Sequence, residues 1–210
     1  MNFLVTAGPT REPLDPVRFL SNRSSGKMGY AVAAAAARRH EVRLVTGPVV
    51  LRPPKGVRTI SVVTAEEMCA AVDQNLKWCD VLIMAAAVCD WRPVEVKRHK
   101  IKKTKSLPSL KLERTPDILK TMMPKKGKRT FVGFAAETRT VAREARRKLK
   151  EKGLDLIVAN DVSRRGSGFE SDNNRVLLIS SNGTLERLPL MPKTAVAARI
   201  VKWVEARRRT

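Results

Sequence analysis

The sequence predicts an α/β fold, a Rossmann-like, doubly wound, mainly parallel sheet that carries a basic flap or dimerisation arm. Short continuous apolar runs alternate along the 210 residues with longer segments of helical period. Such runs are typical of parallel strands covered on both faces, and their alternation with helices predicts a parallel sheet. After the first run, residues 7–26 form a loop of small residues that leads into an Ala-rich helix, which is the layout of an anion-binding site.

The apolar runs and the helical periodicity place the elements in chain order. Strands are expected at 2–6, 42–46, 59–63, 80–86, 130–134, 155–159 and 175–180. Helices are expected at 27–39, 65–77, 116–123, 139–152 and 193–207. Thr64 and Glu67 predict a capping box at the start of the second helix, and Gly153 predicts the end of the fourth. The chain length fits a single domain, 1–210.

Two segments do not fit the alternation of strands and helices. Residues 87–114 are too long and too basic for a plain connection, so they are expected to form a flap or dimerisation arm. Residues 160–174 are rich in Gly, Ser and Asn and indicate a functional loop.

The net charge of +22 favours anionic partners. Solvated Lys and Arg faces explain much of it, and aromatic residues make up only 4 % of the chain, so nucleic acid is expected to bind only non-specifically. The 3 cysteines have no zinc-ligand spacing and are expected to be reduced thiols. With no signal-peptide pattern and no apolar run long enough to cross a membrane, we expect a cytoplasmic protein with no membrane partner.

The loop 7–26 matches neither of two common phosphate-binding motifs. The dinucleotide-binding GxGxxG is absent, and in a Walker-type loop Met28 would replace the Ser or Thr and Ser21 the first Gly. Ser24, Ser25 and Gly26 at a helix start still offer donors for a phosphate. A capped helix after a long loop remains the structural alternative.

Several long motifs carry a resemblance to a known family. They are TAGPTREPLDPVR at 6–18, LSNRSSGKMG at 20–29, AAAVCDW at 85–91, KIKK at 100–103, GFAAET at 133–138 and ANDV at 159–162. In this order they resemble bacterial phosphopantothenoylcysteine synthetases, over nearly the whole chain.

The resemblance implies a ligase that joins 4′-phosphopantothenate to L-cysteine in coenzyme A biosynthesis. CTP would activate the substrate carboxylate as an acyl-cytidylate with release of pyrophosphate, and the cysteine amine would then displace CMP. A carboxylate beside a triphosphate requires cations and Mg²⁺. The resemblance also implies a homodimer. FMN is not expected, because the chain starts directly at the synthetase strand.

The resemblance assigns roles by matching positions. The catalytic residues would be Asn22, Arg18 and Lys100. Nucleotide would be bound by Gly8, Thr10, Ala86, Asp90, Lys100, Thr115, Pro116, Asp117, Ile118, Phe134, Lys148 and Lys152. The substrate would be bound by Arg18, Asn22, Ser24, Ser25, Gly26, Ala87 and Asn160. The metal ligands are unknown, with Asp90 as the candidate.

Purely structural roles remain open for some of these residues. Core packing would explain Phe134, a solvated helix face would explain Lys148 and Lys152, and a turn would explain Asn160. Two other classes of function stand beside the ligase: a nucleic-acid-binding protein and a non-catalytic regulatory protein of the same fold. The choice between CTP and ATP is left open by the sequence.

Overall fold

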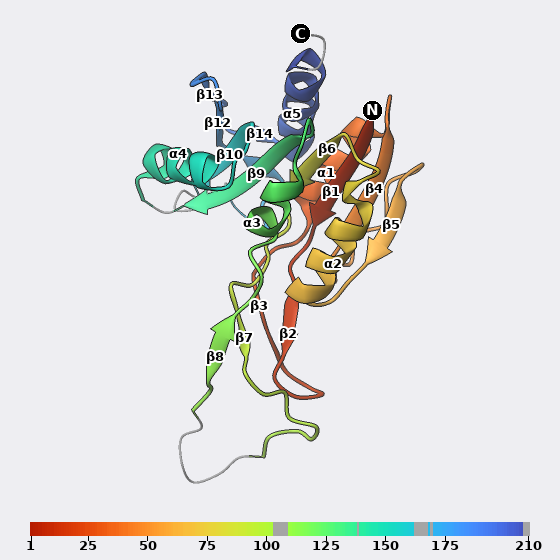
Figure 1. The fold of residues 1–210 in the computed structure, drawn as a ribbon, viewed down its shortest axis with the longest axis vertical. Helices are drawn as coiled ribbons and strands as arrows, with labels where there is room; N and C mark the ends of the chain where they lie inside the picture. The colour runs from red at the N-terminus through yellow and green to blue at the C-terminus, as the bar shows by residue number, and fades with distance from the viewer. Residues whose placement is uncertain (103–108, 138, 162–167, 169, 208–210) are drawn as a thin grey trace.

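A twisted sheet of eight strands forms the body of the molecule in the computed structural model (Figure 1). The structure describes residues 1–102, 109–137, 139–161, 168 and 170–207. The sheet strands are β1 (Asn2–Ala7), β4 (Glu41–Thr46), β5 (Arg58–Ser61), β6 (Val81–Met84), β9 (Thr130–Glu137), β10 (Leu156–Asp161), β12 (Val176–Ser180) and β13 (Leu185–Arg187). Their order across the sheet is β13-β12-β10-β9-β6-β1-β4-β5.

The six strands from β5 to β10 are parallel, and β12 and β13 add an antiparallel hairpin at one edge. From β1 the chain proceeds outward to β4 and β5, then returns to β6 on the other side of β1. The order therefore reverses between β1 and β6, and ligands of doubly wound sheets bind beyond the carboxyl ends of the strands at this point. The predicted doubly wound, mainly parallel sheet is confirmed.

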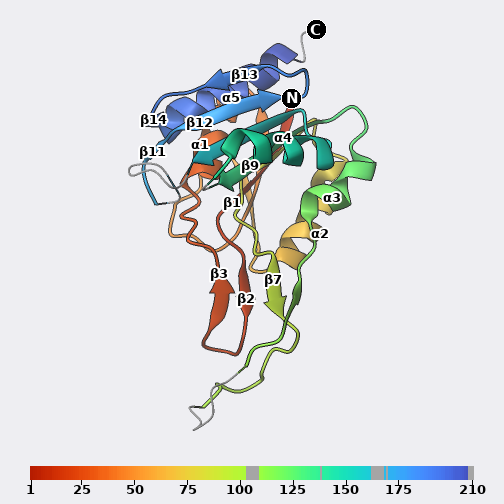
Figure 2. The same cartoon turned by 90° about the vertical axis from the view of Figure 1, so that its left-hand side faces the viewer.

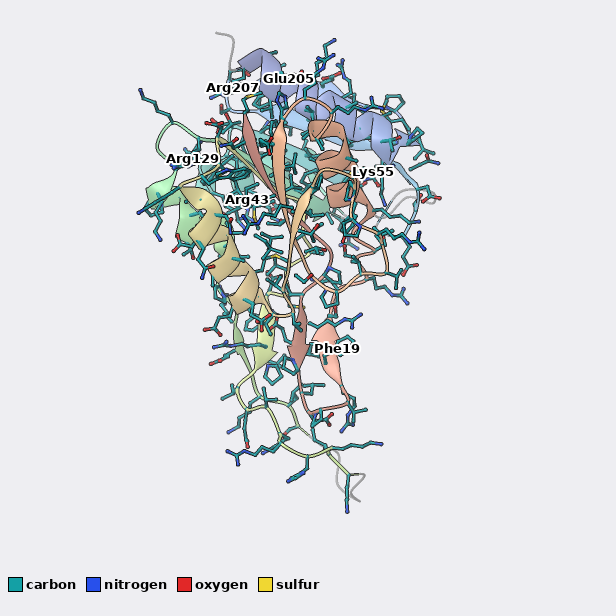
Figure 3. The ribbon with its side chains drawn as sticks, turned by 90° about the vertical axis from the view of Figure 1, so that its right-hand side faces the viewer. Phe19, Arg43, Lys55, Arg129, Glu205 and Arg207 are labelled. Carbon is teal, nitrogen blue, oxygen red and sulfur yellow. The ribbon has the colours of Figure 1, made fainter. Side chains whose placement is uncertain are left out.

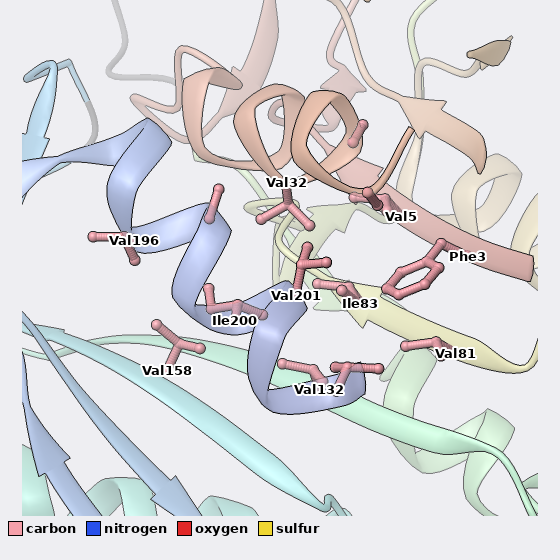
Figure 4. Close-up of a cluster of buried hydrophobic side chains, with 14 of the residues drawn as sticks. Phe3, Val5, Val32, Val81, Ile83, Val132, Val158, Val196, Ile200 and Val201 are labelled. Atoms are coloured by element: carbon pink, nitrogen blue, oxygen red, sulfur yellow. The ribbon is translucent and has the colours of Figure 1, made fainter. Parts of the chain in front are cut away.

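Helices cover both faces of the sheet. The helices are α1 (Lys27–Ala36), α2 (Ala65–Leu76), α3 (Ile118–Met122), α4 (Val141–Glu151) and α5 (Lys193–Arg207), with a 3-10 turn η1 (Met123–Lys125). On one face α1 and α5 pack together over Phe3, Val132 and Val158 (Figure 4). On the other face α2, α3 and α4 cover Leu4, Phe131 and Ile157. The alternation of side chains along each strand supplies both cores, which explains the continuous apolar runs.

All seven expected strands and all five expected helices are present, with changes at their ends. One change is at the third helix, which was expected at 116–123 and begins at Ile118. Asp117 is its N-cap, with the carboxylate accepting from the N–H of Lys120 at 3.2 Å, so Pro116 lies outside the helix. Strands of two or three residues were not expected: β2 (Arg11–Pro13), β3 (Phe19–Ser21), β7 (Trp91–Pro93), β8 (Leu112–Arg114), β11 (Asn173–Asn174), β13 and β14 (Met191–Pro192).

Both ends of α2 are held by side chains. The predicted capping box is confirmed, since Thr64 accepts from the N–H of Glu67 and the carboxylate of Glu67 accepts from the N–H of Thr64. At the other end Arg129, labelled in Figure 3, donates to the carbonyl oxygens of Leu76 and Cys79 at 2.7 and 3.1 Å. These bonds satisfy carbonyl groups that a helix end leaves without partners.

A long arm extends from the body beyond the carboxyl edge of the sheet (Figures 1 and 2). Two antiparallel ribbons build it, β2 with β3 and β7 with β8. The predicted flap 87–114 supplies only the second ribbon, and the loop 11–21 supplies the first. Many large apolar side chains of the arm are exposed, among them Val17, Phe19 (labelled in Figure 3), Trp91, Val94, Val96, Leu110 and Leu112.

Asp15 fastens the two ribbons of the arm together. Its buried carboxylate accepts from the guanidinium of Arg18 at 2.5 Å and from the backbone N–H of Ile101 at 3.1 Å. Arg18 also donates to the carbonyl oxygen of Ile101 at 2.9 Å. The Arg18 guanidinium, and then the backbone donors, hold the pKa of Asp15 far below its usual range.

In the part of the chain that the structure describes, no helix is long and apolar enough to span a membrane.

Candidate active site

A cleft of about 730 Å³ lies at the carboxyl ends of the strands, where the strand order reverses. The start of α1, the loop that follows β6, the turn before α3 and the ends of β9 and β10 form its walls. The predicted site residues that line it are Asn22, Ser24, Gly26, Ala86, Ala87, Asp90, Thr115, Pro116, Asp117, Ile118, Phe134, Lys148, Lys152 and Asn160. Residues far apart in the sequence therefore meet at one site, as the fold class predicts.

The start of α1 approaches the sheet closely. Gly26 is its N-cap with φ of 78°, and no side chain caps the helix there. Gly29 packs against β1 so tightly that an added Cβ would lie 2.5 Å from the Cβ of Ala7. The first turn of α1 thus lines the cleft beside Ser24, and a helix N-terminus at this place favours an anion.

Asn22 joins the first loop to the loop that follows β6. Its side-chain amide donates to the carbonyl oxygens of Ala87 and Val88, both at 3.0 Å. Two carbonyl acceptors fix which end of the carboxamide carries nitrogen. Both hydrogens of this amide are used within the protein, which leaves the oxygen of Asn22 as the group with acceptor capacity for a ligand.

Gly8 and Thr10 form the layer behind the cleft wall rather than the wall itself. The hydroxyl of the fully buried Thr10 accepts from the N–H of Cys89 at 2.9 Å. The carbonyl oxygen of Gly8 accepts from the N–H of Ala87 at 2.9 Å. These bonds place the loop 86–90. Burial raises the pKa of the Cys89 thiol, so this cysteine stays protonated at neutral pH.

The turn 115–118 forms another part of the cleft wall. The N–H of Thr115 donates to the carbonyl oxygen of Asp90 at 3.1 Å, and the hydroxyl of Thr115 donates to that of Cys89. Phe134 is half-buried: it packs on the α1–α5 core and also lines the cleft. Phe134 can therefore pack in the core and contact a ligand at the same time.

The two predicted phosphate-binding lysines each form an ion pair with a carboxylate. Lys148 lies 2.7 Å from Glu137, and Lys152 lies 3.1 Å from Asp117. Neither lysine belongs to a solvated helix face, since both line the cleft. An incoming phosphate would compete with these carboxylates for the two ammonium groups.

Besides Gly8 and Thr10, three further predicted site residues lie outside the cleft of their own chain. Ser25 is next to the cleft-lining Ser24 but is not part of the wall. Arg18 and the exposed Lys100 are both on the arm, where the guanidinium of Arg18 is engaged with Asp15 and Ile101. Lys103, in the KIKK motif, falls outside the described residues.

The structure adds cleft residues that sequence reasoning did not assign to the site, namely Lys27, Arg114, Asn174 and Lys193. The sequence signal that could have assigned Lys27 to the site is the Gly-Lys pair at 26–27, which resembles the end of a phosphate-binding loop. Asn174 belongs to the segment 160–174 that was expected to be a functional loop, and its buried side chain accepts a hydrogen bond from the amide of Asn160 at 3.3 Å. Burial, first of all, together with the charge of Lys27 lowers the pKa of Lys193 to about 8.

The cleft is strongly cationic. Among the described lining residues, Lys27, Arg114, Lys148, Lys152 and Lys193 face only two carboxylates, Asp90 and Asp117. No group of three or more His, Cys, Asp or Glu side chains in the described part of the chain could hold a metal ion. Mg²⁺ in nucleotide enzymes needs only one or two carboxylates together with substrate phosphates, and Asp90 supplies one on this wall.

The fold and this cleft define a class: Rossmann-like α/β proteins with a cationic cleft at the carboxyl edge of a doubly wound sheet. Comparison with known proteins narrows the class. The family model of the DNA/pantothenate metabolism flavoprotein C-terminal domain matches residues 1–207. The chain belongs to this family.

The similarity extends over the whole chain. The chain is 46% identical over 205 residues to the coenzyme A biosynthesis bifunctional protein CoaBC of Bacillus subtilis, and the alignment covers 97% of this chain and 50% of that protein. The CoaBC of Escherichia coli is 46% identical over 218 residues, with 100% and 54% covered. The chain thus spans about half the length of the curated relatives it matches.

Solved structures identify which half it matches. The crystal structure of the C-terminal domain of a coenzyme A biosynthesis bifunctional protein CoaBC has a TM-score of 0.85 and 44% identity, covering 99% of this chain and 95% of that one. A DNA/pantothenate metabolism flavoprotein from Streptococcus pneumoniae has the same fold, with a TM-score of 0.85 at 23% identity. So does a Cab2 mutant, H337A, in complex with phosphopantothenate-cysteine, at 18% identity and a TM-score of 0.76.

Proposed function

We propose that this chain is a phosphopantothenoylcysteine synthetase, which joins 4′-phosphopantothenate and L-cysteine through an amide bond. The observation that carries the proposal is the position of Asn22, fixed on the carbonyl oxygens of Ala87 and Val88 in a cleft with five cationic and two acidic side chains. A cleft with that balance suits a reaction that brings a phosphorylated carboxylic acid to a nucleoside triphosphate. The relatives named for coenzyme A biosynthesis support the same reaction.

The proposed reaction has two steps. An oxygen of the phosphopantothenate carboxylate attacks the α-phosphorus of CTP, which forms the acyl-cytidylate and expels pyrophosphate. The amine of cysteine then attacks the acyl carbon, and the C–O bond to CMP breaks as the amide forms and the ammonium proton is lost. The carboxylate alone is a poor acyl donor, and the mixed anhydride supplies the leaving group.

The cleft residues would act mainly by binding and electrostatics. The start of α1 with Ser24 and Gly26, and the cations Lys148 and Lys152, would stabilise the phosphate charge. The side-chain oxygen of Asn22 would accept a hydrogen bond from the attacking cysteine amine. This role is left to the oxygen because the amide nitrogen already donates to two backbone carbonyl groups. Mg²⁺, held by the nucleotide phosphates with Asp90, would neutralise the departing pyrophosphate.

Pyrophosphate release tests the function directly. The purified protein is supplied with 4′-phosphopantothenate, Mg²⁺ and either CTP or ATP, with and without cysteine. We expect release that depends on phosphopantothenate and CTP, and amide product once cysteine is added. A folded protein that releases pyrophosphate with neither nucleotide would contradict the proposal, and release with ATP alone would correct the nucleotide.

The proposal includes a homodimer formed through the arm. Exposed apolar side chains such as Val94, Val96 and Leu112 are gathered on the arm, where a partner would cover them. Arg18 and Lys100 are also on the arm and do not line the cleft of their own chain. In a dimer, the arm of one chain would supply these two residues to the cleft of the other chain. A cytoplasmic location is also proposed, in keeping with the free thiols of Cys69, Cys79 and Cys89.

Sedimentation of a matched pair of variants tests the dimer. Leu112→Asp puts a charge on the apolar arm and should shift the protein toward monomer with loss of activity. Val50→Asp puts the same charge on a fully exposed valine away from the arm, and should change neither. If both variants sediment as the wild type does, the arm does not form the interface.

A further inference from the structure

Side chains take over from regular strand pairing in holding the loop that follows β6. The parallel pairing of β1 with β6 ends at Thr6 and Met84. Beyond this point the buried hydroxyl of Thr6 accepts from the N–H of Ala86 at 3.1 Å, in place of a backbone carbonyl group. An isolated bridge between Pro9 and Ala87 adds a further contact. The path of this cleft-lining loop is therefore set by residues of the first loop that lie behind it.

Thr10 connects this loop to the segment that carries Asn22. The hydroxyl of Thr10 accepts from the N–H of Cys89 at 2.9 Å, and its N–H donates to the carbonyl oxygen of Ala87 at 3.3 Å. Its own carbonyl oxygen accepts from the hydroxyl of Ser21 at 2.8 Å. Thr10 is fully buried and is not part of the described cleft wall, so it acts on a ligand only through these neighbours.

The contacts of Thr10 reach the carboxamide of Asn22 from both sides. Ser21 precedes Asn22 in the chain, so the bond to the hydroxyl of Ser21 holds the backbone that carries the amide. The carbonyl oxygen of Ala87 accepts both from the N–H of Thr10 and from the amide of Asn22. Val88, the other acceptor of this amide, lies between the two residues of the loop that Thr10 binds. Thr10 thus holds the support of the amide together with its acceptors.

We infer that Thr10 is a positioning residue for Asn22, which it holds in place for the reaction without touching the substrate. The inference rests on the proposed function and deepens it, because there the oxygen of Asn22 accepts from the attacking amine. A group in that role tolerates displacements of only a fraction of an ångström. The hydroxyl of Thr10 is the decisive contact: without it the buried N–H of Cys89 has no acceptor, and the loop must shift to recover one.

Space filling is the alternative role of a buried threonine, and two substitutions separate it from positioning. Thr10→Val keeps the shape of the side chain and loses the hydroxyl. Thr10→Ser keeps the hydroxyl and loses a methyl group, which leaves a small cavity. Positioning predicts that Thr10→Ser is active and Thr10→Val is impaired, whereas space filling predicts the opposite order.

Steady-state kinetics of amide formation measures this order. We expect kcat to fall by about 10- to 100-fold in Thr10→Val and by less than about threefold in Thr10→Ser. Thr130→Val is the matched control, because it replaces another buried threonine, at the start of β9 and away from the cleft, and should turn over as the wild type does. Thr10→Val at the wild-type rate, or Thr10→Ser as impaired as Thr10→Val, would overturn the inference.

A double-mutant cycle shows whether Thr10 acts through Asn22. If it does, Thr10→Val should change kcat by less than about twofold in the Asn22→Ala background. The same fold loss in that background as in the wild type would overturn the inference, because the loss would then reach the reaction by another route.

Nuclear magnetic resonance tests the positioning without any turnover. The side-chain amide signals of Asn22 are identified by their absence from Asn22→Ala, and they report the bonds to Ala87 and Val88. We expect Thr10→Val to shift these signals, and Thr10→Ser and Thr130→Val to leave them in place. Unshifted signals in Thr10→Val overturn the inference whatever the activity of that variant.

Failure to fold and failure of the proposed function are both distinguishable from failure of the inference. If Thr10→Val does not fold, Ser21→Ala removes a contact of Thr10 from an exposed residue and should shift the same signals; unshifted signals there overturn the inference. A wild type that releases no product, while Thr10→Val shifts the Asn22 signals, rejects the synthetase and supports the positioning. Product formation by the wild type with unshifted signals in Thr10→Val rejects the positioning role alone.

Discussion

Single side chains set the chemistry of the cleft by what they hold in place. Asn22 is the clearest case, because one carboxamide links the first loop to the loop that follows β6. The geometry gives its nitrogen a positioning role and leaves its oxygen for the ligand. A carboxylate of the same shape has no hydrogens to donate, so it would face two carbonyl oxygens with a negative charge.

Replacing Asn22 by aspartate should therefore abolish most of the activity. We expect kcat for amide formation to fall by about 100-fold or more, the usual scale for loss of one preorganised polar group in an active site. Asn182→Asp is the control, because the oxygen of Asn182 in its surface turn acts as an acceptor, which aspartate retains. Turnover of Asn22→Asp at more than half the wild-type rate would remove Asn22 from the mechanism.

Asp15 provides a prediction of pH dependence at the same scale. Its native pKa lies well below the usual aspartate value of 3.8, so its contribution to stability is fully present above that pH. As the pH falls below 3.8 the unfolded state takes up the proton first, and the contribution declines toward the native pKa. Urea unfolding of wild type and Asp15→Asn should thus differ by a constant amount above about pH 5 and converge in acid. A difference that grows in acid would contradict the assignment.

Whole elements are fixed here by residues that lie outside them. The N-terminal end of α2 is bound by a side chain of the arm. The buried carboxylate of Glu12 accepts a hydrogen bond from the N–H of Ala65 at 2.9 Å. Its C-terminal end is held by Arg129. Arg92 of β7 adds ion pairs to Glu66 and Glu113, at 2.6 and 2.8 Å. Through these contacts α2 anchors the base of the arm to the body.

Glu12 and Glu66 allow a comparison of a buried and an exposed carboxylate beside the same helix start. Glu12→Ala leaves a buried N–H of Ala65 without its partner and should lower the free energy of unfolding by about 1–3 kcal/mol. Glu66→Ala removes an exposed ion pair and should cost less than about 1 kcal/mol. Urea denaturation followed by circular dichroism measures both. Equal losses would mean that burial does not decide the value of these carboxylates.

At the scale of the whole molecule, the net charge of +22 exceeds what the cleft uses. The exposed side of α4 alone presents Arg143, Arg146 and Lys150. A surface of this kind attracts any polyanion and gives an affinity that depends on counterion release rather than on sequence. The charge therefore does not require a specific nucleic-acid role, and the ligase remains the function that the cleft supports.

Fluorescence anisotropy with labelled DNA duplexes measures this background affinity. We expect binding that is equal for unrelated sequences and falls by more than about 10-fold between 50 and 200 mM salt. A Lys193→Met variant should bind DNA as the wild type does, because it changes a buried charge. Sequence preference, or affinity that resists salt, would favour the nucleic-acid-binding alternative over the ligase.

Long elements were predictable because their signal is local. Apolar runs and helical periods placed every sheet strand except the edge strand β13, and Thr64 with Glu67 marked the start of α2. The short strands of the arm were not predictable. A strand of three residues such as β7 carries too little pattern, and it exists because β8 lies beside it. The boundary of α3 shifted because Asp117 could serve either in the first turn or as the cap, and the local packing selected the cap.

The sequence by itself determined the fold class, the edge of the sheet that carries the cleft and many of the residues that line the cleft, because periodicity and motif order are properties of the chain. Only the tertiary structure decided how their charges are arranged. It paired Lys148 with Glu137 and Lys152 with Asp117, moved Arg18 and Lys100 onto the arm, and buried Lys193 beside Lys27. Burial and charge proximity depend on residues that are distant in sequence and adjacent in space, so no local pattern encodes them.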